Sequence, residues 1–166
     1  MELAKQAMTQ LMTAPNGRES LFKAVCKDIT NNVKSTRASI WTFNMLNTAI
    51  TAEALYDTRY DVFTAGAVLS KDEFPAYFAA IERDGEIIAS HAELHPATSA
   101  FTDVYFRPNE ICSLLDFVIA VGGVPVGVLC CEHCKDIKDW SKADENYLHQ
   151  MSSLLAISLR AMRRQT

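Results

Sequence analysis

Two apolar runs joined by a pair of glycines constrain the fold more than any other feature of the sequence. Residues 113–133 read SLLDFVIAVGGVPVGVLCCEH, and Gly122 and Gly123 separate the two runs. Tight two-residue hairpin turns need backbone conformations with positive φ, which glycine adopts without steric cost. The segment therefore predicts two antiparallel strands at the centre of a sheet.

Three segments have the apolar spacing of amphipathic helices. They are residues 2–12, residues 18–33, and the segment that begins at Ser141 and runs almost to the end of the chain. In residues 18–33 the apolar side chains recur at intervals of three and four: Leu21, Phe22, Val25, Ile29 and Val33. Pro15 ends the first helix, and Asp144 is placed to cap the last one.

The middle of the chain predicts shorter elements. Residues 38–43 and 48–56 are rich in β-forming residues and predict a hairpin, residues 71–83 a short helix, and residues 87–89 a brief strand. Residues 91–107 form a polar, aromatic-rich stretch that we expect to be a long loop with one or two helical turns. Helices flanking an antiparallel sheet indicate an α+β fold.

Composition limits the class of protein. The chain has 166 residues, of which 49% are hydrophobic, so we expect one domain over 1–166. A net charge of -4 lacks the basic excess that nucleic-acid binding needs. Neither a signal peptide nor an apolar stretch of about 20 residues occurs, so the sequence predicts a cytoplasmic protein that does not bind membranes.

Three segments resemble the GAF family of sensory domains, in particular those of bacterial signalling proteins. They are RASIWTFN (37–44), FTDVYFRPNEICSLLDFVIAVGGVPVGVLCCEH (101–133) and WSKADENYLHQMSSLLAISL (140–159). The resemblance implies a central antiparallel sheet of five to six strands, with the N- and C-terminal helices on one face. Loops and short helices, here residues 74–105, would form a roof over a ligand pocket on the other face.

The resemblance also implies a function. A domain core over about 18–160 would bind a small molecule, and the flanking helices 1–14 and 141–166 would form a homodimer and relay the signal. The relay would act on an output domain or partner protein, and the chain itself holds no output domain, so it is a stand-alone module or a fragment. A ligand-free dimerisation module is a further alternative.

Candidate ligand-binding residues come from the strands, the short helix and the roof: Trp41, Phe43, Tyr77, Phe78, His91, Tyr105, Arg107, Asp116 and His133. The aromatic residues fit a core role equally well. Asp116 lies inside an apolar run, so either a ligand or a structural hydrogen bond must satisfy its carboxylate. Arg107 can bind an anionic ligand or pair locally with Asp103 or Glu110.

The five cysteines include a Cys131-x-x-Cys134 pair. Such a pair can form a disulfide or bind a metal, so a thiol-based redox or metal-responsive switch is an alternative function. No second pair of ligands completes a zinc site, and buried, inert thiols account for the same residues. One GAF branch reduces free methionine sulfoxide with cysteines in and beside the roof, but this roof contains none.

The cofactor stays unknown. Covalent bilin attachment would require a Cys-His pair before Tyr105, where this chain has Phe101 and Thr102, so no covalent bilin is expected. The cyclic-nucleotide signature is represented only by Trp140-x-x-x-Asp144-Glu145 and is not supported. No catalytic constellation stands out, so the sequence predicts a protein that is not an enzyme.

Overall fold

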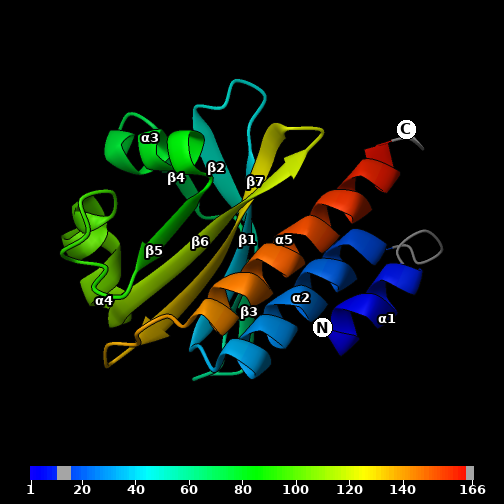
Figure 1. The fold of residues 1–166 in the computed structure, drawn as a ribbon, viewed down its shortest axis with the longest axis horizontal. Helices are drawn as coiled ribbons and strands as arrows, with labels where there is room; N and C mark the ends of the chain where they lie inside the picture. Colours follow the sequence, from blue (N-terminus) through cyan, green and yellow to red (C-terminus); the bar gives the residue numbers. More distant parts are fainter. Residues whose placement is uncertain (11–15, 164–166) are drawn as a thin grey trace.

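One antiparallel sheet of seven strands organises the molecule (Figure 1). The computed structural model describes residues 1–10 and 16–163. The order across the sheet is β3-β2-β1-β7-β6-β5, and β4 also pairs with β2. The strands are β1 (Arg37–Phe43), β2 (Ala49–Asp57), β3 (Val62–Thr64), β4 (Val68–Ser70), β5 (Glu86–Ala89), β6 (Ile111–Val121) and β7 (Val124–Cys134). The predicted α+β class is confirmed.

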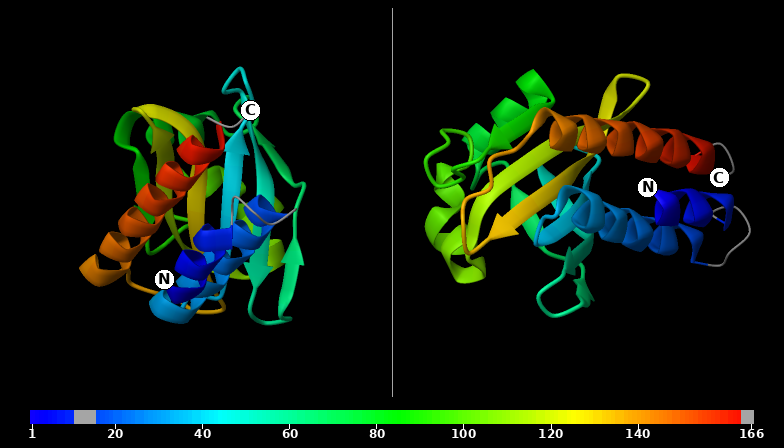
Figure 2. Two further views of the ribbon diagram at one scale, coloured as in Figure 1. Left: turned by 90° about the vertical axis from the view of Figure 1, so that its right-hand side faces the viewer. Right: turned by 60° about the horizontal axis from the view of Figure 1, so that its bottom comes forward.

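The helices divide between the two faces of the sheet (Figure 2). On one face, the helix side, lie α1 (Glu2–Gln10), α2 (Gly17–Val33) and α5 (Lys142–Arg163). The other face, the roof side, is covered by α3 (Pro75–Asp84), a 3-10 turn (Ser99–Phe101), a π-helical turn (Thr102–Phe106) and α4 (Arg107–Asn109). Each face has its own apolar core, as the resemblance implied.

The glycine pair forms the expected turn. Gly122 and Gly123 have φ of 61° and 81°, and the turn places Val121 opposite Val124. Side chains of β6 then alternate between the faces, with Leu115 on the helix side and Asp116 on the roof side. Because both faces are covered, the strand is apolar almost throughout.

One helix boundary differs from the prediction. The helix predicted for residues 71–83 begins at Pro75 instead. Ser70 and Glu73 are spaced like helix-capping residues, and the Glu73 amide donates to Ser70 Oγ while the Ser70 hydroxyl donates to Glu73 Oε2, but these bonds stabilise a turn before the helix. Phe74 precedes a proline and takes an extended φ of -128°, since the proline ring disfavours the helical conformation there. For the first helix, residues 11 and 12 and the break at Pro15 lie outside the described residues.

The capping of α5 follows the prediction. The Ser141 amide donates to Asp144 Oδ2 at 2.9 Å, and the Asp144 amide donates to Ser141 Oγ at 3.2 Å. Trp140, just before this cap, is 8% exposed and packs in the helix-side core. The Trp140 and Asp144 positions that echo a cyclic-nucleotide signature thus have structural roles at the start of α5.

Two strands were not predicted. β3 and β4 have three residues each, too few for an alternating pattern to stand out. β3 pairs with residues 55–57 and β4 with residues 49–51, so they follow one another along the outer edge of β2. They raise the strand number to seven, above the five to six that the resemblance implied.

Replacing Gly127 with alanine should destabilise the fold by about 1 to 3 kcal/mol. An added Cβ would lie 2.3 Å from the carbonyl oxygen of Trp41 on the neighbouring strand, so β1 and β7 would have to separate. Urea unfolding measures the change. Val124→Ala, at a 57% exposed position of the same strand, is the control and should have little effect. Equal unfolding midpoints for the two variants would contradict this close strand approach.

Candidate functional site

A small cavity lies between the sheet and the roof. Its volume is about 20 Å³, the space of roughly one water molecule. Strands β1, β2, β4, β6 and β7 supply its floor and walls, and α3 and the π-helical turn cover it. The lining residues are Trp41, Ile50, Leu69, Tyr77, Phe101, Tyr105, Phe106, Leu114, Asp116, Cys130 and Glu132.

Aromatic rings from the roof fill most of the space over the sheet. The Phe101 ring stacks on Phe74 with centroids 4.2 Å apart, and it meets the Tyr77 ring edge-on at 5.2 Å. Phe106 and Tyr105 continue the cluster at 5.7 and 6.3 Å from Phe101. Phe101 is only 2% exposed, so its buried ring fills space between the roof and the sheet beside the cavity.

Asp116 is the polar centre of the cavity. It is 1% exposed, and its Oδ2 accepts a hydrogen bond of 2.7 Å from the Tyr77 hydroxyl. Its Oδ1 is buried without a hydrogen-bond partner. Burial raises the pKa of Asp116 to about 7, although hydrogen bonds from the Cys130 thiol and the Tyr77 hydroxyl favour the ionised form. The structural role predicted for Asp116 is therefore only half fulfilled, since one oxygen is still free to accept a hydrogen bond.

A second buried carboxylate, Glu132, lies on the adjacent strand and is 1% exposed. Arg37 Nε lies 3.3 Å from Glu132 Oε2, and the Arg37 guanidinium stands over the Tyr105 ring at 5.5 Å. The Arg37 Nη2 also donates to the Tyr105 hydroxyl at 3.4 Å. Through its contacts with both Tyr105 and Glu132, Arg37 connects the roof to strands β1 and β7.

Further ion pairs extend from Arg37 to the end of α4. Arg37 Nε lies 3.7 Å from Asp57 Oδ2, and Asp57 receives two hydrogen bonds from the guanidinium of Arg59, at 2.8 and 3.0 Å. Arg59 Nη1 in turn donates to the Asn109 carbonyl and to Glu110, both at 3.1 Å. A chain of charges thus joins β1, β2 and β7 to α4.

Four of the nine predicted ligand-binding residues line the cavity: Trp41, Tyr77, Tyr105 and Asp116. Phe43 and Phe78 belong to the roof-side core but do not line the cavity. Their rings meet edge-on at 6.3 Å, so they support α3 on the sheet. Phe43 and Phe78 therefore have the core role that the sequence also allowed for the aromatic residues.

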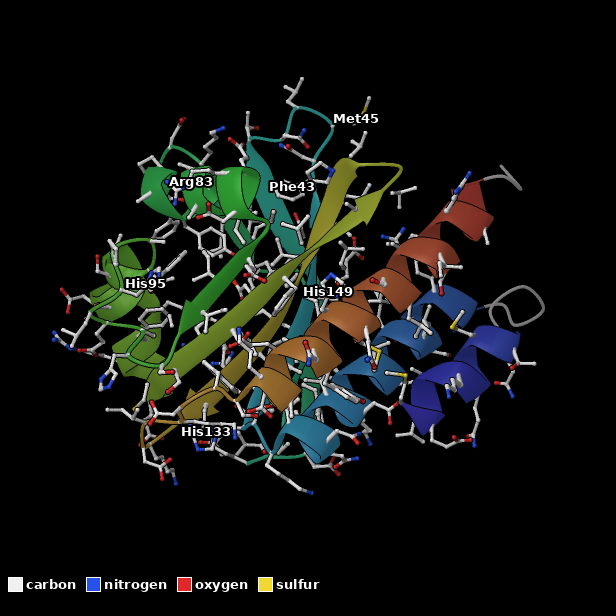
Figure 3. All side chains as sticks on the ribbon, viewed as in Figure 1. Phe43, Met45, Arg83, His95, His133 and His149 are labelled. Carbon is white, nitrogen blue, oxygen red and sulfur yellow. The ribbon has the colours of Figure 1, made fainter. Side chains whose placement is uncertain are left out.

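The other three predicted site residues also lie outside the cavity. His91 is exposed. Arg107 has a side chain that is 63% exposed; it pairs with Asp103, one of its two predicted local partners, and with Glu93. His133 lies near the end of β7, at the bottom of the view in Figure 3. Its Nε2 is 2.9 Å from Asp136 Oδ1. The structure does not bring these three residues to the cavity.

The sequence reasoning missed Glu132, Arg37 and Phe101. Glu132 had the same signal as Asp116, a carboxylate inside an apolar strand, and it falls on the same face because the two strands pair with Leu114 opposite Glu132. Arg37 stands at the start of β1, where an exposed residue is the usual expectation. No sequence signal distinguishes Phe101 from other aromatic residues of the roof.

The proposed partners of the thiol switch point to opposite faces. Cys131 packs in the helix-side core and Cys134 in the roof-side core, since side chains alternate along a strand. Their α-carbons are separated by about 10 Å of extended chain, beyond the roughly 7 Å that a disulfide spans. Burial raises the pKa of both thiols, that of Cys134 to about 11. The Cys131/Cys134 disulfide or shared-metal hypothesis is wrong for this fold.

A thiol titration should give one fast and four slow cysteines. Cys112 is partly exposed, whereas Cys26, Cys130, Cys131 and Cys134 are buried. Ellman's reagent should therefore label Cys112 in the native protein and the other four only after unfolding in urea. Cys112→Ser is the control and should remove the fast phase. Rapid labelling of that variant would indicate that the strand thiols are open to solvent.

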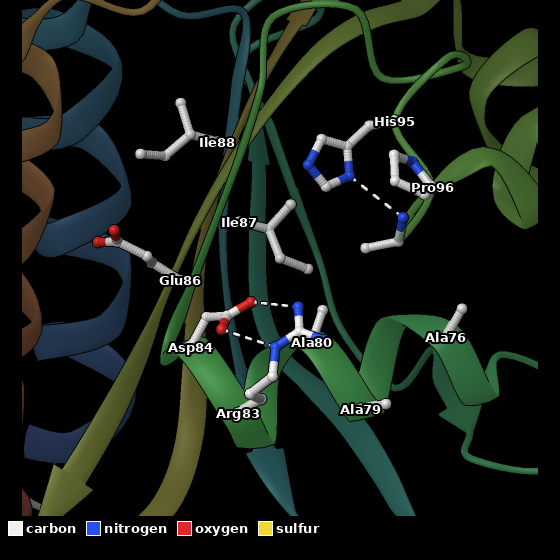
Figure 4. A pocket seen from close by; sticks show the side chains of 11 residues that line it. Ala76, Ala79, Ala80, Arg83, Asp84, Glu86, Ile87, Ile88, His95 and Pro96 are labelled. Atoms are coloured by element: carbon white, nitrogen blue, oxygen red, sulfur yellow. Dashed lines mark hydrogen bonds and ion pairs between the residues drawn. The ribbon is translucent and has the colours of Figure 1, made fainter.

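A larger groove lies outside the cavity, between α3, β5 and residues 95–97 (Figure 4). It encloses about 640 Å³ and opens to solvent. Three of its polar side chains already have partners: Arg83 pairs with Asp84, and the His95 ring accepts a hydrogen bond from the Ala97 amide at 3.2 Å. Among the described residues, the free acceptor Asp116 Oδ1 lies in the small cavity and not in this groove.

Metal and membrane features are absent from the described part of the chain. Within residues 1–10 and 16–163, no three His, Cys, Asp or Glu side chains come together in a group able to hold a metal ion. None of the helices there combines the length and apolar character that crossing a bilayer requires.

Comparisons with known proteins agree with this geometry. At 18% identity, the GAF domain of a phosphoenolpyruvate-protein phosphotransferase from Coxiella burnetii matches with a TM-score of 0.71, covering 99% of this chain and 94% of that one. A methyl-accepting chemotaxis protein matches at 13% identity and a TM-score of 0.78, covering 97% and 99%. The free methionine-R-sulfoxide reductase from Neisseria meningitidis matches at 11% identity and 0.75, covering 99% and 90%.

These identities demonstrate a shared fold and leave activity open. The search of curated proteins found no match to this chain. The sequence pattern of the GAF domain family, in contrast, matches residues 17–159, which is most of the chain. The match begins at α2, spans the whole sheet and the roof, and ends within α5. On this ground the chain belongs to the GAF domain family.

Proposed function

We propose that this GAF domain is a regulatory sensory domain of bacterial signal transduction, in which a small molecule binds beneath the roof and α5 relays its presence. The observation that carries the proposal is the buried Oδ1 of Asp116, which lies in the small cavity without a hydrogen-bond partner. A buried acceptor without a hydrogen bond is costly, and a ligand that donates to it removes that cost. Structurally similar domains occur in a chemotaxis protein and in the phytochrome of Stigmatella aurantiaca, both sensory proteins.

Strand β6 offers a short path for the relay. Asp116 faces the cavity, and the next residue, Phe117, packs on the other face against α5, where its ring meets that of His149 at 6.1 Å. Since side chains of adjacent residues are fixed to one backbone, a ligand that moves Asp116 also shifts the surface on which α5 rests. The C-terminal helix then carries the change toward an output domain or partner protein.

The small cavity favours a second candidate, a domain that dimerises without binding any ligand. A volume of about 20 Å³ holds no metabolite. Under this alternative the roof stays closed, and the aromatic cluster around Phe101 is ordinary core. The two candidates differ in whether the roof opens.

Native mass spectrometry of freshly purified protein and hydrogen exchange separate the candidates. A sensor should carry or take up a small molecule, and amides of residues 98–106 should exchange much faster than those of β6 and slow down when the ligand binds. A ligand-free module should show the mass of the chain alone, with the roof as protected as the sheet. That second result would overturn the sensory proposal.

We also propose a homodimer through the terminal helices. Leu3 on α1 and Ile157 on α5 are apolar and 38% and 65% exposed. Ile157→Asp should therefore convert the dimer to a monomer at micromolar concentration, as measured by light scattering, because a charge in an apolar interface is strongly unfavourable. Leu94→Asp, at a 79% exposed roof position, is the matched control and should stay dimeric. A monomeric wild-type protein would contradict the proposal.

A further inference from the structure

The charges around the roof cavity do not balance. Asp116 and Glu132 are both 1% exposed and lie on neighbouring strands, with Asp116 opposite Cys130 and Glu132 two positions further along. Arg37 contacts Glu132, at 3.3 Å, and provides the single cationic partner there. In the described part of the chain the side-chain partners of Asp116 are neutral, the Tyr77 hydroxyl and the Cys130 thiol, and its Oδ1 has no hydrogen-bond partner. The ionised cavity therefore has one negative charge that no protein cation offsets.

The rest of the lining also suits a cation. Five aromatic side chains surround the carboxylates, and the negative faces of aromatic rings attract positive charge. The cavity already contains one example, because the guanidinium of Arg37 lies 5.5 Å from the centre of the Tyr105 ring. The aliphatic lining residues Ile50, Leu69 and Leu114 add apolar surface for a ligand body.

We infer that the ligand class of this site is a small organic cation, an amine or amidine carried on a flat apolar body, whose N–H groups donate to Oδ1 of Asp116. The inference rests on the proposed sensory function and specifies its ligand. A neutral ligand would leave the negative charge of the Asp116 carboxylate without a counter-charge. An anion would lie beside two buried carboxylates.

Room for the ligand comes from the Phe101 side chain. Its ring lies in the aromatic cluster directly over the cavity and contacts Phe74 and Tyr77. A ligand ring can replace it there, stacking on Phe74 while its cationic group reaches Asp116. Phe101 is the residue directly before the π-helical turn Thr102–Phe106, and π-helical turns are found frequently at functional sites. Ligand binding thus competes with a side chain of the protein itself.

Three probes of nearly equal size and different charge test the inference: benzylamine, benzyl alcohol and benzoate. Phe101→Ala removes the competing ring, so calorimetric titration of this variant at pH 8 should detect benzylamine binding. We expect benzylamine to bind roughly ten to a hundred times more tightly than benzyl alcohol, the gain of a charge-assisted hydrogen bond, and benzoate not to bind. Phe101→Leu is a second variant for the case that Phe101→Ala does not fold.

Asp116→Asn, introduced into the Phe101→Ala background, locates the interaction. It should weaken benzylamine binding by at least about tenfold and leave benzyl alcohol binding unchanged. Asp28→Asn is the matched control, because Asp28 is a carboxylate 4% exposed on the helix side, and it should change neither affinity.

Two outcomes would overturn the inference in different ways. Equal affinity for benzylamine and benzyl alcohol, or benzylamine binding that Asp116→Asn leaves unchanged, would refute the cationic ligand class while the cavity is retained as a binding site. No binding of any probe to the wild-type chain, Phe101→Ala or Phe101→Leu would refute the ligand class and the proposed roof site together.

Discussion

Replacing Arg37 with methionine should destabilise the folded chain by about 3 to 5 kcal/mol. Arg37 is 4% exposed, and its guanidinium lies 3.3 Å from the carboxylate of Glu132, which is 1% exposed. The methionine side chain has similar length but no charge, so the Glu132 carboxylate would be left buried without a cation. An isolated buried charge costs far more than the loss of an exposed ion pair.

The double variant Arg37→Met/Glu132→Leu should recover most of this stability, because both charges are then replaced by apolar groups of similar size. Asp57 keeps its pair with Arg59, at 2.8 Å, in either variant. Urea unfolding followed by tryptophan fluorescence gives the free energies of unfolding of the wild type, the single variant and the double variant. Arg83→Met, which removes an exposed charge, is the control. A loss no larger than that of the control would mean that the buried pair does not hold the roof to the sheet.

Asp116→Asn should stabilise the protein by roughly 4 kcal/mol above pH 7 and leave it nearly unchanged at pH 4. The pKa of Asp116 is raised from 3.8 to about 7 by burial, so the folded state binds a proton that the unfolded state has released. Between these values the folded state holds more protons, and wild-type stability falls by about 1.4 kcal/mol for each rise of one in pH. Asparagine keeps an acceptor for Tyr77 and cannot ionise.

Urea unfolding at pH 4, 5.5, 7 and 8 measures this difference between wild type and Asp116→Asn. The difference should grow up to pH 7 and then level off, since both states of the wild type are ionised above that value. Tyr77→Phe removes the hydrogen bond that favours the ionised carboxylate, so its stability should continue to fall at higher pH than that of the wild type. Parallel pH profiles for wild type and Asp116→Asn would refute the raised pKa.

Most of the fold could be predicted because its elements have strong local signals. The glycine turn between β6 and β7 and the stripe of α2 each depend on a few neighbouring residues. β3 and β4 could not be predicted, because their hydrogen bonds to β2 are set by where the chain returns and not by a local pattern. The start of α3 depended on one proline, Pro75, which outweighed the capping residues before it.

The site could be predicted only in part, since its geometry depends on pairing between distant segments. Asp116 was identified because a carboxylate inside an apolar strand requires a partner. Its neighbour Glu132 and the cation Arg37 are placed by the registers of β7 with β6 and β1, which no single segment determines. Conversely, Arg107 and His133 are polar residues near the site in sequence, yet both turn toward local carboxylates at the surface.

The two unpredicted strands have a consequence for solution behaviour. Strand β2 has nine residues, and β3 and β4 together occupy most of its outer edge, while the opposite edge of the sheet ends in the four-residue β5 beside α3. Long bare strand edges recruit further chains and nucleate fibrils. In the described part of this chain every outer strand is short, so the protein should resist amyloid-like growth even in concentrated samples.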